Sequence, residues 1–378
     1  MMRTGKSVQR NFVLAALATV VILTVPGSGF AAVSDPDIPS VKAMPEPRSI
    51  TDEIKLANDY FTGHGVGLDL KQSAYWFRKA AESGDPQAEA QIGYFYDAGI
   101  GVESDPRIAA HWYQLAAAGG LTTAKVNLAV LYLWGTGVEK NQQLGMQLLR
   151  EAAMKGNGLA ACDLGDMYSL GIGVPRDRTQ GEQWYVKGAE LHDPQAEFDL
   201  GQLFFNQTDH PHDQRKAASL FRQSVAAGYV PAMTSLGLLL VHNPALAHSK
   251  DEATQLLKKA AEAGIWKSSM ILGVLERDGK GQPADPREAY YRFRIAGLQG
   301  GKDVDSLLQN DLKDLAARLG PAQTAALDSR AEDWYRQHHL VLSFVYKESG
   351  SGTLFPNYAI AVPVNGSHAS QMVPAIPE

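Results

Sequence analysis

AEAQIGYFYDAGIGVESDPRIAAHWYQLAAAGG spans residues 88–120, and AKVNLAVLYLWGTGVEKNQQLGMQLLREAAMKG spans residues 124–156. The two stretches align at a separation of 36 residues, and the same register continues in both directions. Position one of each unit is Asp52, Ala88, Ala124, Ala160, Ala196, Ala232 and Ser268. Seven units of 36 residues therefore cover residues 52–303 without an insertion. A constant period of this length is typical of a solenoid of stacked repeats.

The first half of each unit carries apolar residues at helical spacing. Position five is Leu56, Ile92, Leu128, Leu164, Leu200, Leu236 and Leu272. Position nine is Tyr60, Tyr96, Tyr132, Tyr168, Phe204, Leu240 and Glu276. Residues four apart share one face of a helix, so positions five and nine form an apolar stripe. Position six is Gly or Ala throughout, which permits another helix to approach closely.

A turn and a second helix complete the unit. The turn is Gly-x-Gly-Val at 63–66, 99–102, 135–138 and 171–174, and glycine permits the left-handed conformation that ends a helix. Helix-capping side chains follow at Asp69, Asp105, Asn141, Asp177, Asp213 and Asp285. The second helix carries large side chains such as Trp76-Phe77 and Trp112-Tyr113, and most of these helices are followed by Gly. Each unit is thus predicted to be a helix–turn–helix pair.

This skeleton resembles the Sel-one-like repeat family, relatives of the tetratricopeptide repeats. Repeats one to four match most closely, whereas repeats five and six lose the Gly-x-Gly turn, and repeat seven has Glu276 in the aromatic position. The pattern predicts an all-α, right-handed superhelical solenoid of seven 36-residue repeats. Residues 304–339 are expected to form two capping helices, because Leu307, Leu308, Leu312, Leu315 and Leu319 lie at helical spacing and Gly320-Pro321 interrupts them.

The chain ends carry different signals. Residues 1–31 are typical of a secretory signal peptide, with Arg3, Lys6 and Arg10 before an apolar run and a cleavage site after Ala31. The alternative is an uncleaved anchor helix. Residues 32–51 are interpreted as a Pro-rich linker, and 340–378 as a mostly disordered tail. Within this tail, 340–346 is apolar enough for a strand or an extended docked segment, and 354–356 is an alternative docking peptide.

Composition excludes several functions. The net charge is −6 and no Lys/Arg-rich block occurs, so no nucleic-acid partner is expected. The sequence has no nucleophile–base motif, no His-Glu-x-x-His and no phosphate loop, so an enzyme is not expected and no cofactor is assigned. The one cysteine, Cys162, is expected to be buried and inert. A zinc site is conceivable from His210, His212, His242 and His248, but solvent-exposed loop histidines are the preferred interpretation, so no metal is assigned.

First helices line the concave surface in solenoids of this type, and their positions four, seven and eleven form one stripe. The candidate protein-binding residues on it are Tyr94, Asn127, Val130, Trp134, Asp163, Asp166, Asp199 and Gln202. Tyr94, Val130 and Trp134 suggest an apolar anchor, and the three aspartates suggest a site for a basic segment. The alternative is that Val130 and Trp134 pack between repeats and the acids form a solvated face.

These observations favour an exported interaction scaffold, periplasmic or secreted, that binds a peptide or helix of a partner protein. As the resemblance implies, it would assemble or regulate a cell-envelope complex. No membrane insertion is expected after signal cleavage. Two alternatives remain open: a hydrolase acting on cell-wall or β-lactam substrates, which the missing catalytic motifs disfavour, and a secreted effector that binds host proteins.

Overall fold

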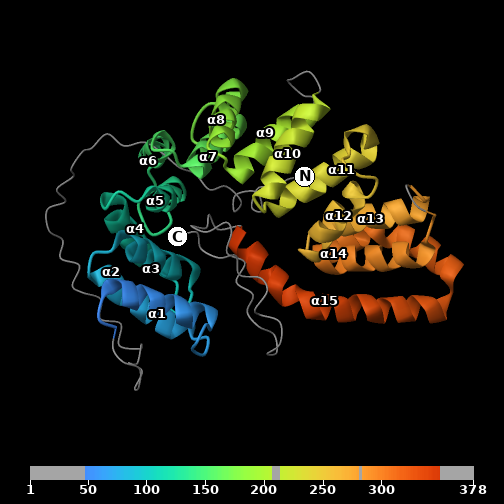
Figure 1. The fold of residues 1–378 in the computed structure, drawn as a ribbon, viewed down its shortest axis with the longest axis horizontal. Helices are drawn as coiled ribbons and strands as arrows, with labels where there is room; N and C mark the ends of the chain where they lie inside the picture. The colour runs from blue at the N-terminus through green and yellow to red at the C-terminus, as the bar shows by residue number, and fades with distance from the viewer. Residues whose placement is uncertain (1–46, 207–212, 281–282, 350–378) are drawn as a thin grey trace. The chain divides into compact units, whose positions relative to one another are not determined.

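The computed structural model describes residues 47–206, 213–280 and 283–349, with side chains up to residue 338. Within these ranges helices are the only regular secondary structure, which confirms the all-α prediction. The chain divides into two compact units after His192, and each is described by itself (Figure 1). Every helix within the described ranges is too short or too polar to cross a lipid bilayer.

The first unit contains four helix pairs, one for each of repeats one to four. In each pair the two helices pack against each other, and the second helices of repeats one to three also contact the first helix of the following repeat. The helices are α1 (Ile50–Thr62), α2 (Leu70–Glu82), α3 (Pro86–Ala98), α4 (Pro106–Ala118), α5 (Thr122–Trp134), α6 (Gln142–Met154), α7 (Gly158–Leu170) and α8 (Arg178–Glu190).

The second unit contains repeats five to seven and the helices that follow them. They are α9 (Pro194–Asn206), α10 (Gln214–Ala226), α11 (Val230–His242), the 3₁₀ turn η2 (Pro244–Leu246), α12 (Glu252–Glu262), α13 (Trp266–Asp278), α14 (Pro286–Leu319) and α15 (Pro321–Ser349). Helix α14 is broken at Gly301, whose φ of 73° and ψ of −166° are not helical. The second helix of repeat seven therefore ends there, and the expected helical cap consists of the rest of α14 followed by α15.

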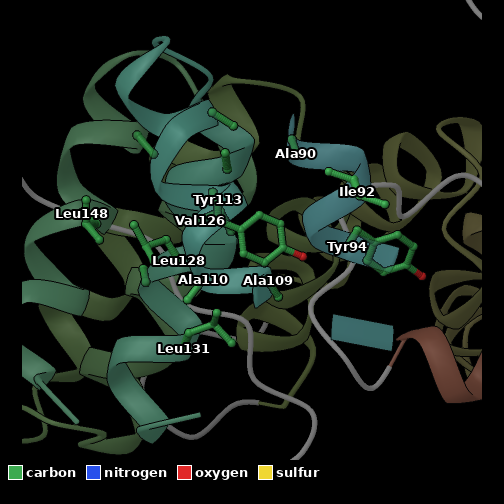
Figure 2. Packing of buried hydrophobic residues seen from close by; sticks show 14 of the residues in the cluster. Ala90, Ile92, Tyr94, Ala109, Ala110, Tyr113, Val126, Leu128, Leu131 and Leu148 are labelled. Atoms are coloured by element: carbon green, nitrogen blue, oxygen red, sulfur yellow. The ribbon is translucent and has the colours of Figure 1, made fainter. Parts of the chain in front are cut away.

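The two helices of a repeat meet at the small residue of position six. In repeat two a methyl group added at Gly93 would lie 2.9 Å from the Tyr113 ring, and in repeat five one at Gly201 would lie 2.7 Å from the Phe221 ring. Tyr113 is completely buried, and Figure 2 shows its ring between residues of α3 and residues of α5. Glycine thus provides the space that a large side chain of the second helix fills.

The two glycines of the Gly-x-Gly turn have different roles. The first, such as Gly99 with φ of 72°, ends the first helix in the left-handed conformation. The second lies against the preceding repeat, where a methyl group at Gly101 would overlap the backbone of Leu70 and one at Gly137 would overlap that of Pro106. Gly65 in repeat one has the same left-handed backbone but nothing within 4 Å of an added methyl group.

The expected capping side chains bind as predicted. Asp105 Oδ1 accepts from the Arg107 N–H at 2.9 Å, and Asn141 Oδ1 accepts from the Leu144 N–H at 3.0 Å. The backbone N–H of Asp105 also donates to the carbonyl of Tyr96 at 2.9 Å, so the cap of the second helix is joined to position nine of the first. The same backbone bond recurs from Asp69, Asn141, Asp177 and Asp285 to position nine of their repeats.

Side-chain contacts hold the turn of repeat six, which lacks Gly-x-Gly. Arg222 on α10 donates to the carbonyl of Leu246 at 2.7 Å and pairs with Glu252 at 3.0 Å. Asn243 donates to Gln214 at 2.7 Å. The turn is thus bound to the preceding repeat through side chains, where repeats two and three use a close backbone contact.

Two expected boundaries are corrected. Helix α1 begins at Ile50, capped by Ser49, so the Pro-rich linker ends before residue 51. Helix α15 continues to Ser349, so the segment 340–346 is helical and is neither a strand nor part of a disordered tail. Three expectations concern segments outside the described residues. They are the signal peptide at 1–31, the docking peptide at 354–356 and the turn at 207–210, which lacks Gly-x-Gly.

The close backbone approach predicts a difference between two matched glycine variants. Gly65→Ala should cost about 1–2 kcal/mol of unfolding free energy, since alanine is disfavoured in the left-handed conformation. Gly101→Ala should cost about 1–3 kcal/mol more, because its methyl group also overlaps Leu70. Urea unfolding of the two full-length variants measures the difference, and equal losses would contradict the proposed role of the second glycine.

Candidate functional site

The eight residues expected to bind a partner are divided between the two units. Tyr94, Asn127, Val130, Trp134, Asp163 and Asp166 belong to the first unit, and Asp199 and Gln202 belong to the second. Each group is therefore considered within its own unit.

Four of the six residues in the first unit are buried. Tyr94 and Asn127 are 5% exposed, Asp163 is 0% exposed and Asp166 is 6% exposed. The expectation that these side chains face an open groove is therefore wrong. The reason is visible in α7, where every residue from 160 to 167 is buried. Eight consecutive residues make more than two helical turns, so all faces of the helix are covered there.

Asp166 is held by a side chain of its own repeat. The Tyr185 hydroxyl on α8 donates to Asp166 Oδ1 at 2.5 Å. Burial raises the pKa of Asp166 to about 6, and the hydrogen bond from Tyr185 opposes that shift. The residue thus binds the two helices of repeat four together and does not present a charge to a partner.

A second buried polar group lies between repeats two and three. Burial raises the pKa of the Tyr113 hydroxyl well above its ordinary value, with a further contribution from the negative charge of Asp97. Burial also raises the pKa of Asp97 itself to about 6. The Asn127 amide lowers the pKa of Tyr113, which places it beside that hydroxyl. Asn127 accordingly belongs to the packing of Tyr113.

In repeats three and four the less buried residues of the stripe are Val130 at position seven and Trp134 and Leu170 at position eleven. Val130 and Trp134 are half-buried and pack against the main apolar cluster of the first unit, as the packing interpretation expected. Leu170, at position eleven of the next repeat, is 50% exposed. Trp134 and Leu170 end their helices directly before a glycine, beyond the covered part of each helix. Sequence reasoning missed Leu170, although it occupies the same repeat position as Trp134.

One of the two candidates in the second unit, Gln202, contacts the next repeat. Asp199 and Gln202 are half-buried on α9. Gln202 Nε2 donates to Ser235 Oγ at 3.3 Å, which joins position seven of repeat five to position four of repeat six. These two positions therefore mediate contact between neighbouring repeats.

Other candidate sites gain little support. A hollow of about 690 Å³ is lined by Tyr96, Gly137 and residues 103–108, and none of the eight candidates lines it. Within the described ranges, no group of three or more His, Cys, Asp or Glu side chains is placed to hold a metal ion. His242 and His248 lie in the second unit, whereas His210 and His212 lie outside the described residues. Cys162 is buried, as expected.

Comparison with known structures finds several repeat proteins, one of which shows the same fold. A Sel1 repeat protein from Oxalobacter formigenes is 26% identical over 64% of this chain and 98% of its own, with a TM-score of 0.56. A protective antigen of uropathogenic Escherichia coli with an SLR fold is 23% identical over 79% of this chain and 71% of its own, with a TM-score of 0.44. An immunity protein from Pseudomonas aeruginosa is 20% identical over 58% and 82%, with a TM-score of 0.42. No curated protein matches the chain.

Comparison with family models gives seven consecutive matches to the Sel1 repeat. They cover residues 53–85, 86–121, 122–157, 158–193, 194–229, 230–265 and 268–301. Sel1 repeat proteins generally act as scaffolds for protein–protein interaction and are typically not enzymes. The seven matches span most of the chain and coincide with the seven helix pairs. This chain therefore belongs to the Sel1 repeat family.

Proposed function

We propose that this protein is an exported adaptor that binds a partner polypeptide at the ends of the first helices of repeats three and four. In this role it assembles or regulates a complex of the cell envelope and is periplasmic or secreted. The observation that carries the proposal is the half-exposed Leu170 at the position equivalent to Trp134. The family's general role in protein binding supports the same conclusion.

Trp134 has the side chain of an interface anchor, and Leu170 adds exposed apolar surface. Tryptophan is among the residues most enriched in binding hot spots, and apolar side chains at the centre of an interface contribute most when water is excluded around them. The helices that carry the two residues are held on all sides over most of their length, so they are ordered before a partner binds. A partner therefore does not have to order them, which lowers the entropic cost of association.

The chemistry of this surface favours a partner with an apolar anchor. Asp163 and Asp166 were expected to attract a basic segment, but both carboxylates are buried. The proposed partner therefore contributes an aliphatic or aromatic side chain to the surface around Trp134 and Leu170. The partner does not need a basic segment at this surface.

Site-specific photo-crosslinking in the producing cell tests this surface. A photoreactive phenylalanine derivative at Leu170 is expected to capture a defined partner, because the side chain would lie within the interface. Met154 gives a matched control, since it is also in the first unit and 70% exposed but ends a second helix. Mass spectrometry of the crosslinked products identifies what each position captures.

Two further variants make the result decisive. Trp134→Ala should abolish capture from position 170, whereas Met154→Ala should leave it unchanged. Equal capture at 154 and 170, or capture that survives Trp134→Ala, would show that the position-eleven surface is not the binding site.

Export can be tested on the native protein. The intact mass of material from the periplasm or medium should correspond to a chain beginning at Ala32, because signal peptidase would cleave after Ala31. A chain that retains residues 1–31 in the membrane fraction would support the anchor alternative. Full-length protein found only in the cytoplasm would contradict export.

A further inference from the structure

Repeat seven carries two opposite charges where the other repeats carry apolar or aromatic side chains. Position nine is aromatic or leucine in repeats one to six and is Glu276 in repeat seven. Position 25, on the second helix, is Trp or Leu in repeats one to six and is Arg292 in repeat seven. The members of this column are Trp76, Trp112, Leu148, Trp184, Leu220, Leu256 and Arg292. Since both replacements occur in the same repeat, the acid and the base are best understood together.

The carboxyl group of Glu276 is enclosed by the fold. Glu276 is 4% exposed, and its Oε2 has no hydrogen-bond partner among the residues that the structure describes. Its backbone carbonyl accepts from the Asp285 N–H at 2.8 Å, which holds the residue at the start of α14. A buried carboxyl without a partner is expected to favour its neutral form.

Charged groups from the neighbouring elements act on Glu276. Burial raises its pKa to about 7, and Arg292 on α14 opposes this shift. Glu288 on α14 and Asp285 at its cap raise the pKa further, whereas Lys258 on α12 lowers it. Helix α11 also contacts α13, and the titratable side chain that it carries, His242, is bonded to the carbonyl of Leu238 at 2.8 Å.

Lys258 occupies a repeat position that contacts position nine of the following repeat elsewhere in the chain. Gln114 donates to the Tyr132 hydroxyl at 3.2 Å, and Arg150 donates to the Tyr168 hydroxyl at 2.5 Å. Lys258 stands at the same position in repeat six. In repeats three and four, the side chain at this position of the preceding repeat therefore binds the tyrosine hydroxyl of position nine. In repeat seven the equivalent side chain, Lys258, acts on the carboxyl group of Glu276 instead.

Arg292 is bonded to a glutamate that also holds the cap helix. Arg292 Nη2 pairs with Glu288 Oε1 at 3.1 Å, and Arg330 Nη1 on α15 pairs with Glu288 Oε2 at 3.1 Å. The Arg330 guanidinium also lies 3.7 Å from the centre of the Tyr291 ring. The Nε of Arg292 has no hydrogen-bond partner within the described residues. Arg292 therefore keeps a donor free while it holds Glu288 in place for α15.

We propose that Glu276 and Arg292 form a proton-controlled latch on the C-terminal cap. When Glu276 is neutral, Arg292 stays on Glu288 and the Glu288–Arg330 pair fastens α15 to α14. When Glu276 loses its proton, the buried carboxylate recruits Arg292, Glu288 loses its support and α15 is released more often. The cap is therefore firm in mild acid and looser above neutral pH.

The direction of the pH effect follows from the raised pKa. The carboxyl binds its proton more tightly in the closed state than in an opened one, where pairing with Arg292 lowers its pKa toward the ordinary value of about 4.3. Closing is therefore fully favoured below that lower value, and the advantage is lost as the pH rises to about 7. Opening of the cap should become about tenfold more frequent between pH 6 and pH 8.

Hydrogen exchange of the full-length protein at pH 6 and pH 8 tests the latch. After correction for the intrinsic exchange rate, protection of residues 321–338 should fall about tenfold at pH 8. Glu276→Gln should remove this fall, because the amide cannot ionise. Glu276→Tyr restores the side chain found in repeats one to four and should remove it as well, which provides a second readout if the glutamine variant does not fold.

Arg330→Gln is the matched control for attachment. It should lower the protection of residues 321–338 at both pH values, because α15 loses its pair with Glu288 whether or not Glu276 is charged. A tenfold fall that persists in Glu276→Gln and Glu276→Tyr would overturn the proposal. An equal fall across α1–α8 would also overturn it, since the effect would then not be local to the cap.

Discussion

The fit of a large side chain on the second helix against a small residue on the first holds each repeat together. At position six, Gly93 lies against Tyr113 and Gly273 lies against Phe293, with no room for a methyl group unless the ring moves. Tight packing of this kind maximises dispersion contacts and leaves little void volume. It also fixes how close the two helices lie and therefore where the next repeat can stack. Capping, turns and accessible surfaces all depend on this spacing.

Most of the fold could be predicted from the sequence, because its determinants recur every 36 residues. The Gly-x-Gly turns and the capping Asp105 and Asn141 act through local backbone geometry, which a short sequence motif specifies. A further column of small residues was overlooked, although it is equally regular: Ser73, Ala109, Gly145, Gly181, Ala217, Ala253 and Ala289. A methyl group at Gly145 would come within 3.0 Å of the Ala129 carbonyl, so this column marks the same helix crossing from the other side.

The candidate site was predicted less well, because the exposure of a helical residue depends on neighbours that a motif does not specify. Asp163 and Asp166 were expected at the surface because they stand at positions four and seven of a first helix, yet α7 is covered on every side and Tyr185 provides a partner for Asp166. Leu170, at the end of α7, is exposed to solvent. The sequence also shows Glu276 as an exception in its column, but pairing it with Arg292 required comparison of a second column. Functional candidates thus emerge from residues at the ends of helices, and from two repeat positions that depart from their columns in the same repeat.

The backbone bond from the second-helix cap to position nine limits how the array can change in length. The N–H of Asp105 reaches the carbonyl of Tyr96, nine positions earlier in the chain, and Asn141 and Tyr132 keep the same spacing. An extra residue in this turn would separate cap and carbonyl and rotate the next helix out of register. Gain or loss of a whole 36-residue module keeps every such bond. Length variation among natural homologues is therefore expected in complete modules, with small insertions confined to turns such as that of repeat six, where side chains replace the backbone contact.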